Sequence, residues 1–241
     1  DIRKQCLEII NKLLQRSGQN IKAGWLVILE TIYFVVQSSS TNKKTGTELD
    51  SAINAKNAQL IRVGFPSVQL ICTDFMSSLS PMGLSRCIQT VSAFGTFAED
   101  LNISLTSVGL LWSLCDFILT KRQKLEKIES ETSDENQFTL SSSPFKKGSL
   151  LNLSLLSGPL NVMTMDTLWM YLLRNLSELC SDFRPEVRNS ANQTLFRTLS
   201  TNGQRLTIDL WDLCLGHVLF PLLDRIKSSA PDGNEVDKNW D

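Results

Sequence analysis

The chain contains a single histidine, His217, so a Ser-His-Asp or Cys-His constellation would have only one general base available. His217 lies between Leu215 and Val218 in an apolar pattern typical of a helix facing a core. No arrangement of nucleophile and acid is visible around it. A histidine packed in the core or at its edge is therefore favoured over a catalytic one. We predict a non-enzymatic protein with no catalytic residue.

Metal, nucleotide and nucleic-acid sites are not indicated either. The sequence has no Cys-x-x-Cys pair or histidine cluster for zinc, and no Gly-rich phosphate-binding run. The net charge of -1 gives no general attraction to nucleic acid. We predict no metal site, no cofactor and no nucleic-acid partner. The six cysteines are far apart in apolar surroundings, as expected of free thiols in a reducing compartment: Cys6, Cys72, Cys87, Cys115, Cys180 and Cys214.

Two features could take part in binding, and each has a second interpretation. Arg3 and Arg188 occupy matching positions of an internal repeat. They could contact an anion or a partner, but a charge-assisted bond to a turn acid or carbonyl of a neighbouring hairpin is favoured. The serine-rich stretch 141–147, with its Ser143-Pro144 step, could be phosphorylated and so change a contact. No binding residue is assigned.

The clearest structural signal is the stretch Asp182–Arg188 and the helix that follows it. Pro185 suits the first position of a helix, and Glu186 suits its dipole. Gly203 is expected to end the helix in the left-handed conformation. Apolar residues recur every four positions and predict one buried stripe: Val187, Ala191, Leu195 and Leu199.

Further helices are predicted along the chain, separated by two long polar loops. We expect loops at 38–54 and 129–161, a kink or break near Phe65, and a polar tail at 229–241. The longest apolar stretch is taken to be 25–36, which is shorter than the roughly 20 residues that span a bilayer. The predicted helices cover approximately 1–16, 21–37, 55–76, 81–97, 105–128, 162–180, 185–201 and 206–228.

The two ends of the chain repeat one helical unit. A helix, Gly18 and Trp25 can be superimposed on a helix, Gly203 and Trp211; the glycines coincide at an offset of 185 and the tryptophans miss by one residue. Trp112 also heads an apolar run, but strict alternation of helices puts it in the wrong register. Residues 1–228 are therefore predicted to form one all-α, HEAT-like α-solenoid of about three to four helical hairpins. Because the first helix pattern already includes Asp1, we expect the chain to be part of a longer protein.

Several ordered segments resemble the large Arf guanine-nucleotide exchange factors, in the region downstream of the exchange domain. The similarity covers about 1–227 and is strongest to their non-catalytic Golgi relatives. Neither long loop has a recognisable match. The segments that carry the resemblance are Phe183–Ala191 with Gln193–Phe196, Val218–Asp224, Gly24-Trp25, Gln69–Phe75, and Asn102–Thr106 before Gly109–Trp112.

The resemblance implies a scaffold of a large vesicle-transport protein that is cytoplasmic and peripheral on Golgi (trans-Golgi network) and endosomal membranes. It implies binding to Arf-like small GTPases and to a Dopey-type protein, and through that protein to a phospholipid flippase. Membrane association would come through the complex, and self-association is left open. The exchange domain of the catalytic relatives has no match here, so no exchange activity is implied. The alternative is a regulatory HEAT region of a catalytic Arf exchange factor.

Overall fold

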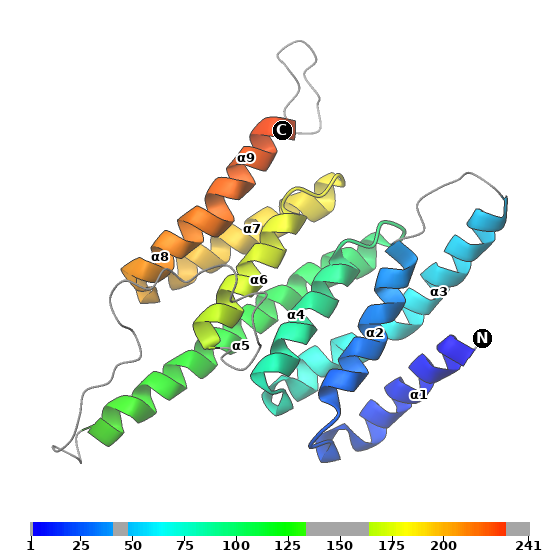
Figure 1. Cartoon of the computed structure of the whole chain (residues 1–241), viewed down its shortest axis with the longest axis horizontal. Coiled ribbons are helices and arrows are strands. Elements are labelled where there is room, and N and C mark those ends of the chain that lie inside the picture. Colours follow the sequence, from blue (N-terminus) through cyan, green and yellow to red (C-terminus); the bar gives the residue numbers. More distant parts are fainter. Residues whose placement is uncertain (1, 41–47, 134–163, 230–241) are drawn as a thin grey trace, which may run out of the picture.

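The computed structural model describes residues 2–40, 48–133 and 164–229, and within them every regular element is helical. The helices lie side by side in two layers, from α1 at one end to α8 and α9 at the other (Figure 1). One layer holds α1 (Ile2–Ser17), α3 (Glu48–Leu70), α5 (Leu101–Ser133) and α7 (Pro185–Asn202). The second layer holds α2 (Trp25–Ser40), α4 (Pro81–Gly95), α6 (Met165–Leu179), α8 (Ile208–Cys214) and α9 (Phe220–Ser229).

Neighbouring helices of one layer pack on each other, and each layer packs on the other. In the first layer α1 packs on α3 and α5 on α7, while in the second α2 packs on α4 and α4 on α6. The described helices thus form four successive hairpins with one continuous apolar core. The prediction of an all-α solenoid of three to four hairpins is confirmed.

The predicted stripe of α7 forms part of that core. Val187, Ala191 and Leu195 are fully buried, and Leu199 is nearly so. Tryptophans near the start of α2, α6 and α8 occupy the second layer, whereas Trp112 belongs to α5 in the first layer. The alternation of helices is therefore regular, and Trp112 is not a position of the repeat.

The predicted loops are shorter than expected because helices extend into them. Helix α2 continues to Ser40, α3 begins at Glu48, and α5 continues to Ser133. Once a helix is nucleated, each further residue adds a hydrogen bond, and 48–54 contains good helix formers such as Glu, Leu and Ala. The rest of the predicted loops and the tail from 230 lie outside the described residues, as does the 141–147 stretch.

Helix α3 does not break near Phe65, where a kink or a break was predicted. Helix α3 runs through Gly64 and Pro66, and Pro66 faces solvent. The carbonyl four residues earlier, which a proline leaves without its helical donor, belongs to the exposed residue Arg62 and can meet water. The regular helix changes later, first into the π-helical turn Ile71–Phe75 and then into the 3₁₀ turn Met76–Ser78.

One segment of α5, Leu101–Leu125, is long and apolar enough to cross a membrane when judged by length and composition alone. It is longer than the 25–36 stretch taken from the sequence as the longest apolar run. In the structure 56% of its most apolar window is buried, and α5 packs against α4, α6 and α7. The core helix of a soluble protein passes the same test, so this segment is weak support for a membrane span.

Positions 18 and 203 need glycine because neighbouring aromatic rings leave no room for a Cβ, and not because the backbone is left-handed. The expected left-handed stop at Gly203 is wrong, because its φ of -56° and ψ of -36° are right-handed. Each glycine begins a 3₁₀ turn, Gly18–Asn20 or Gly203–Arg205. A Cβ at Gly18 would lie 2.2 Å from Cζ of Phe75, and one at Gly203 would lie 2.8 Å from Cζ2 of Trp211. Both repeats therefore use glycine to admit an aromatic ring.

Gly18→Ala is expected to lower the free energy of unfolding by about 1–3 kcal/mol, since the added methyl group overlaps the Phe75 ring. Urea denaturation followed by circular dichroism measures the loss. The matched control is Gly109→Ala in α5, where an added Cβ meets nothing within 4 Å. In a Phe75→Leu background the penalty of Gly18→Ala should shrink; an unchanged penalty would show that the ring is not its cause.

Candidate functional site: a buried arginine joint and a polar row

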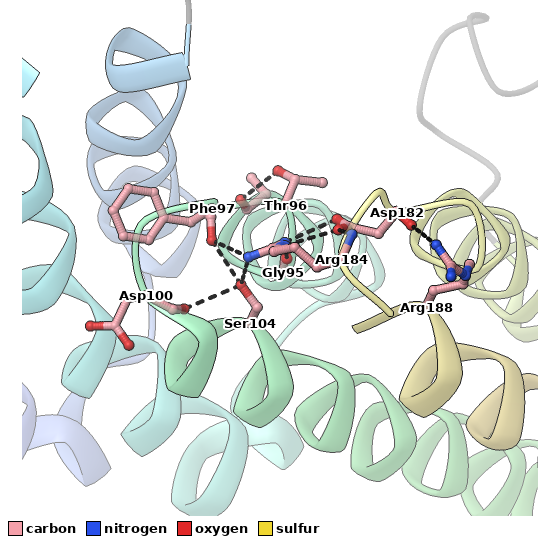
Figure 2. Close-up of polar contacts among 9 residues, drawn as sticks. Gly95, Thr96, Phe97, Asp100, Ser104, Asp182, Arg184 and Arg188 are labelled. Atoms are coloured by element: carbon pink, nitrogen blue, oxygen red, sulfur yellow. Dashed lines mark hydrogen bonds and ion pairs between the residues drawn. The ribbon is translucent and has the colours of Figure 1, made fainter. Parts of the chain in front are cut away.

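A buried arginine, Arg184, connects the turn between α6 and α7 to the turn between α4 and α5 (Figure 2). Its Nε and Nη2 donate to the two carboxylate oxygens of Asp182, each at 2.9 Å. Nη1 donates to the carbonyl oxygen of Phe97 at 2.7 Å and to Oγ of Ser104 at 2.9 Å. Nη2 also donates to the carbonyl oxygen of Gly95 at 3.0 Å. We call these five residues the Arg184 joint.

Local sequence holds the arginine in place. The residue before a proline avoids the helical region, and Arg184 before Pro185 is extended, with φ -82° and ψ 120°. The carboxylate of Asp182 accepts the backbone N–H of Arg184 at 2.9 Å, which closes a short turn. The Asp-Phe-Arg-Pro order thus directs the guanidinium away from α7 and toward the end of α4.

The joint uses every donor of the guanidinium. Arginine has five N–H donors, and the five side-chain bonds above account for all of them. The carbonyls of Gly95 and Phe97 lie at the end of α4, where helix carbonyls lack partners and the dipole favours a cation. The side chains of Arg184 and Asp182 are only 10% and 7% exposed. No donor remains for a ligand, so the joint is structural.

The sequence singled out the neighbouring arginine and missed Arg184. Arg188 is buried, and its Nη1 donates to the carbonyl of Asp182 in the turn before α7 at 3.1 Å. Its repeat counterpart, Arg3, lies at the exposed start of α1. The available signal for Arg184 was an aspartate two residues before it and a proline directly after it.

Asp100 starts α5 beside the joint. Its Oδ2 accepts from Nε of Arg62 at 3.0 Å, and its Oδ1 accepts the N–H of Ile103 at 3.4 Å. The hydrogen bond from Arg62 is the main cause that holds the pKa of Asp100 below its usual value, while burial acts in the opposite direction. The carboxylate therefore anchors α5 to α3 in its charged form.

Because the pKa of Asp100 is lower in the folded chain, its contribution to stability is present at neutral pH and is lost as pH falls through that folded value. Asp100→Asn should reduce the loss of stability between neutral and acidic pH by less than about 1 kcal/mol, since Arg62 is half exposed. Urea titrations at several pH values measure it. Arg62→Gln should give a smaller flattening in the same direction, because the backbone N–H groups of Ile103 and Asn102 still lower the pKa of Asp100. An unchanged pH dependence in Arg62→Gln would contradict the pairing.

A second polar arrangement crosses the surface of the second layer. Nη2 of Arg86 in α4 lies 3.1 Å from a carboxylate oxygen of Glu30 in α2, and its guanidinium lies 5.4 Å from the ring centroid of Tyr33. Nη1 of Arg86 donates to Gln89 at 2.6 Å, and Gln89 donates to the hydroxyl of Tyr33 at 3.0 Å. We call these four half-buried residues the Arg86 row.

The Arg86 row joins two neighbouring helices of the second layer, α2 and α4. Internal hydrogen bonds and an ion pair already fix its side chains. Such a surface suits contact with another protein, since Arg and Tyr are enriched at interfaces.

The remaining candidates do not assemble into a site. His217 is exposed on the π-helical turn Leu215–Leu219. In the part of the chain that the structure describes, no three metal-ligating side chains come together. All six cysteines are free thiols, and all but Cys6 are buried. The hydrogen bond between Cys72 and Cys87, whose sulfurs are 3.6 Å apart, and burial raise the pKa of Cys72.

Stacked hairpins held by internal polar joints define the chain as a segment of an α-solenoid, and comparison with known proteins gives its family. Residues 73–239 match the family model "C-terminal region of Mon2 protein", and residues 1–46 match "Mon2/Sec7/BIG1-like, HDS". The chain belongs to the Mon2 family, which confirms the resemblance found in the sequence. The second match also relates it to the Sec7-like and BIG1-like proteins.

Curated relatives match nearly the whole chain. The Protein MON2 homologs of Drosophila melanogaster and Homo sapiens are each 34% identical, over 98% and 95% of this chain. The Brefeldin A-inhibited guanine nucleotide-exchange protein 2 of Arabidopsis thaliana is 25% identical over 98% of it. The chain spans about 12% of the length of these three relatives. No solved structure matches.

Proposed function

We propose that this segment is a non-enzymatic scaffold within a large trafficking protein, and that it binds an Arf-like small GTPase and a Dopey-type protein. The proposed place of action is the cytoplasmic side of Golgi (trans-Golgi network) and endosomal membranes. Membership of the Mon2 family over most of the chain supports the proposal. The Dopey-type protein would connect the scaffold to a phospholipid flippase and would contribute to its peripheral membrane association.

We assign the contact to the Arg86 row. Its side chains are half exposed, so a partner can reach them, and their mutual hydrogen bonds fix their positions before binding. A fixed side chain loses little conformational entropy when a partner arrives, which favours affinity. The row presents an aromatic ring, a cation and an acid together, which suits a mixed polar protein surface.

A binding assay with purified proteins tests this function. The 241-residue chain is immobilised and exposed separately to an Arf-like GTPase, in its GDP and GTP forms, and to a Dopey-type protein. The wild type is expected to retain at least one of them, and Arg86→Glu should weaken that binding by roughly tenfold or more, as loss of an interface arginine often does. The matched control is Lys56→Glu, an exposed charge on α3 in the other layer. Binding of neither protein would overturn the proposal.

A regulatory role inside a catalytic exchange factor is the second candidate, favoured by the match to an Arabidopsis protein named as a guanine nucleotide-exchange protein. In that case the segment would restrain an exchange domain. The test adds the chain to the exchange domain of such a relative and measures nucleotide release from an Arf GTPase. A slowed release that Arg86→Glu relieves would favour regulation, and an unchanged rate would exclude it.

A further inference from the structure

The outer face of α1 is apolar and uncovered. Ile2 and Ile9 are 78% and 64% exposed, Leu13 is 45% exposed, and Cys6 is also exposed. Their spacing of four, three and four residues places them in one stripe. The opposite side of α1 carries Leu7 and Leu14, which are buried, and α1 packs on α3. We call Ile2, Cys6, Ile9 and Leu13 the α1 outer stripe.

The same positions are covered in the other copy of the repeat. At the offset of 185, the counterparts of the α1 outer stripe lie on α7, which packs against α5. Thr198, the counterpart of Leu13, is fully buried and lies beside Cys115 of α5. The four counterparts are Val187, Ala191 and Thr198, each 0% exposed, and Thr194, which is half-buried.

The order of helices in the first layer explains why this stripe is covered on α7 and uncovered on α1. Helix α7 has a preceding first-layer helix, α5, to cover this stripe, whereas α1 is the first helix of the layer in the described residues (Figure 1). A solenoid is stabilised by contacts between neighbouring repeats, and an end repeat without a polar outer face needs a further repeat or cap. The α1 outer stripe consists of four apolar residues, and α7 buries the counterparts of three of them, so the stripe is not the polar face of a cap.

We propose that the α1 outer stripe is the docking surface for a further helical hairpin of the same solenoid, packed across α1 as α5 packs across α7. The occupant is a part of the longer polypeptide that lies N-terminal to this segment. Two observations favour that source over a second copy. The chain matches a model described as the C-terminal region of its family, and it spans only about 12% of its relatives.

Cys6 gives this proposal a natural probe. It is the one exposed cysteine of the six. Burial raises the pKa of Cys115 and Cys180 to about 12 and that of Cys214 to about 11. Because the thiolate is the reactive form, those buried thiols react slowly with a maleimide, whereas Cys6 is accessible.

The experiment compares labelling of Cys6 by a small maleimide in the 241-residue chain and in the full-length protein, resolved by peptide mass spectrometry. We expect labelling to be at least roughly tenfold slower in the full-length protein, where the stripe is covered. The control is Gln15→Cys in a Cys6→Ser background, because Gln15 is exposed on another side of α1. That thiol should react at the same rate in both proteins.

Two results would overturn the proposal. Equal labelling of Cys6 in both proteins would mean that nothing covers the stripe. If labelling of the 241-residue chain slows as the concentration of that chain rises, and sedimentation gives twice its mass, the stripe is covered by a second copy. An Ile9→Glu variant adds an independent readout: its melting temperature should match wild type in the short chain and fall in the full-length protein. An equal fall in both would place Ile9 in the core of this segment instead.

Discussion

Arg184→Met is expected to lower the free energy of unfolding by about 3–5 kcal/mol, the range found when one partner of a buried ion pair is removed. The variant leaves the carboxylate of Asp182, only 7% exposed, without its cation. It also removes the donors that reach the carbonyls of Gly95 and Phe97 across the α4–α5 turn. Urea denaturation, with circular dichroism to check the folded state, measures the change.

Three further variants distinguish the effect of losing the Arg184 bonds from the effect of losing a positive charge. Arg197→Met removes an exposed guanidinium 4.9 Å from the ring of Trp112 and should cost about 0.5–1 kcal/mol. Arg184→Lys should recover only part of the loss, because an ammonium cannot make the paired bonds to Asp182. Asp182→Asn combined with Arg184→Met should cost less than the sum of the single changes. A loss below about 1 kcal/mol for Arg184→Met would contradict the joint.

The helices were predictable because their signals are local, and the joint was not. The stripe from Val187 to Leu199 follows from a spacing within one helix, and all of it is buried. The partners of Arg184 on the other turn are 80 to 89 residues away in the chain. No spacing rule connects residues so far apart; the packing of α6 and α7 against α4 and α5 brings them together.

For the repeat as well, the sequence indicated the residues but not the contacts they make. The glycine and tryptophan pair was visible in the sequence, but its geometry was not. The indole N–H of Trp25 donates to the carbonyl of Ile21, and that of Trp211 donates to the carbonyl of Gly203, each at 3.0 Å. The two indoles therefore bond different carbonyls: that of Gly203 begins its 3₁₀ turn, whereas that of Ile21 follows the turn Gly18–Asn20. The indole of Trp211 lies against Gly203, and its ring leaves no room for a side chain there. This contact, and not a left-handed end of the helix, explains the glycine.

Trp169→Ala is expected to cost about 3–5 kcal/mol, the range for removing a large aromatic side chain from a core. Trp169 is 1% exposed, and its indole N–H donates to the sulfur of Cys115 at 3.1 Å, so the side chain joins α6 to α5. Because α6 also packs on α4 and α7, the cavity would weaken contacts with three helices at once. Urea denaturation measures the loss.

Trp112→Ala is the matched control for that variant, since Trp112 is partly exposed on α5 and contacts Arg197 near the surface. It should cost about 1 kcal/mol, a typical value for one substitution. Equal losses in the two variants would mean that α6 is held no more firmly than the surface of α5. A larger loss at Trp169 would support its place in the core, where its side chain joins α6 to α5.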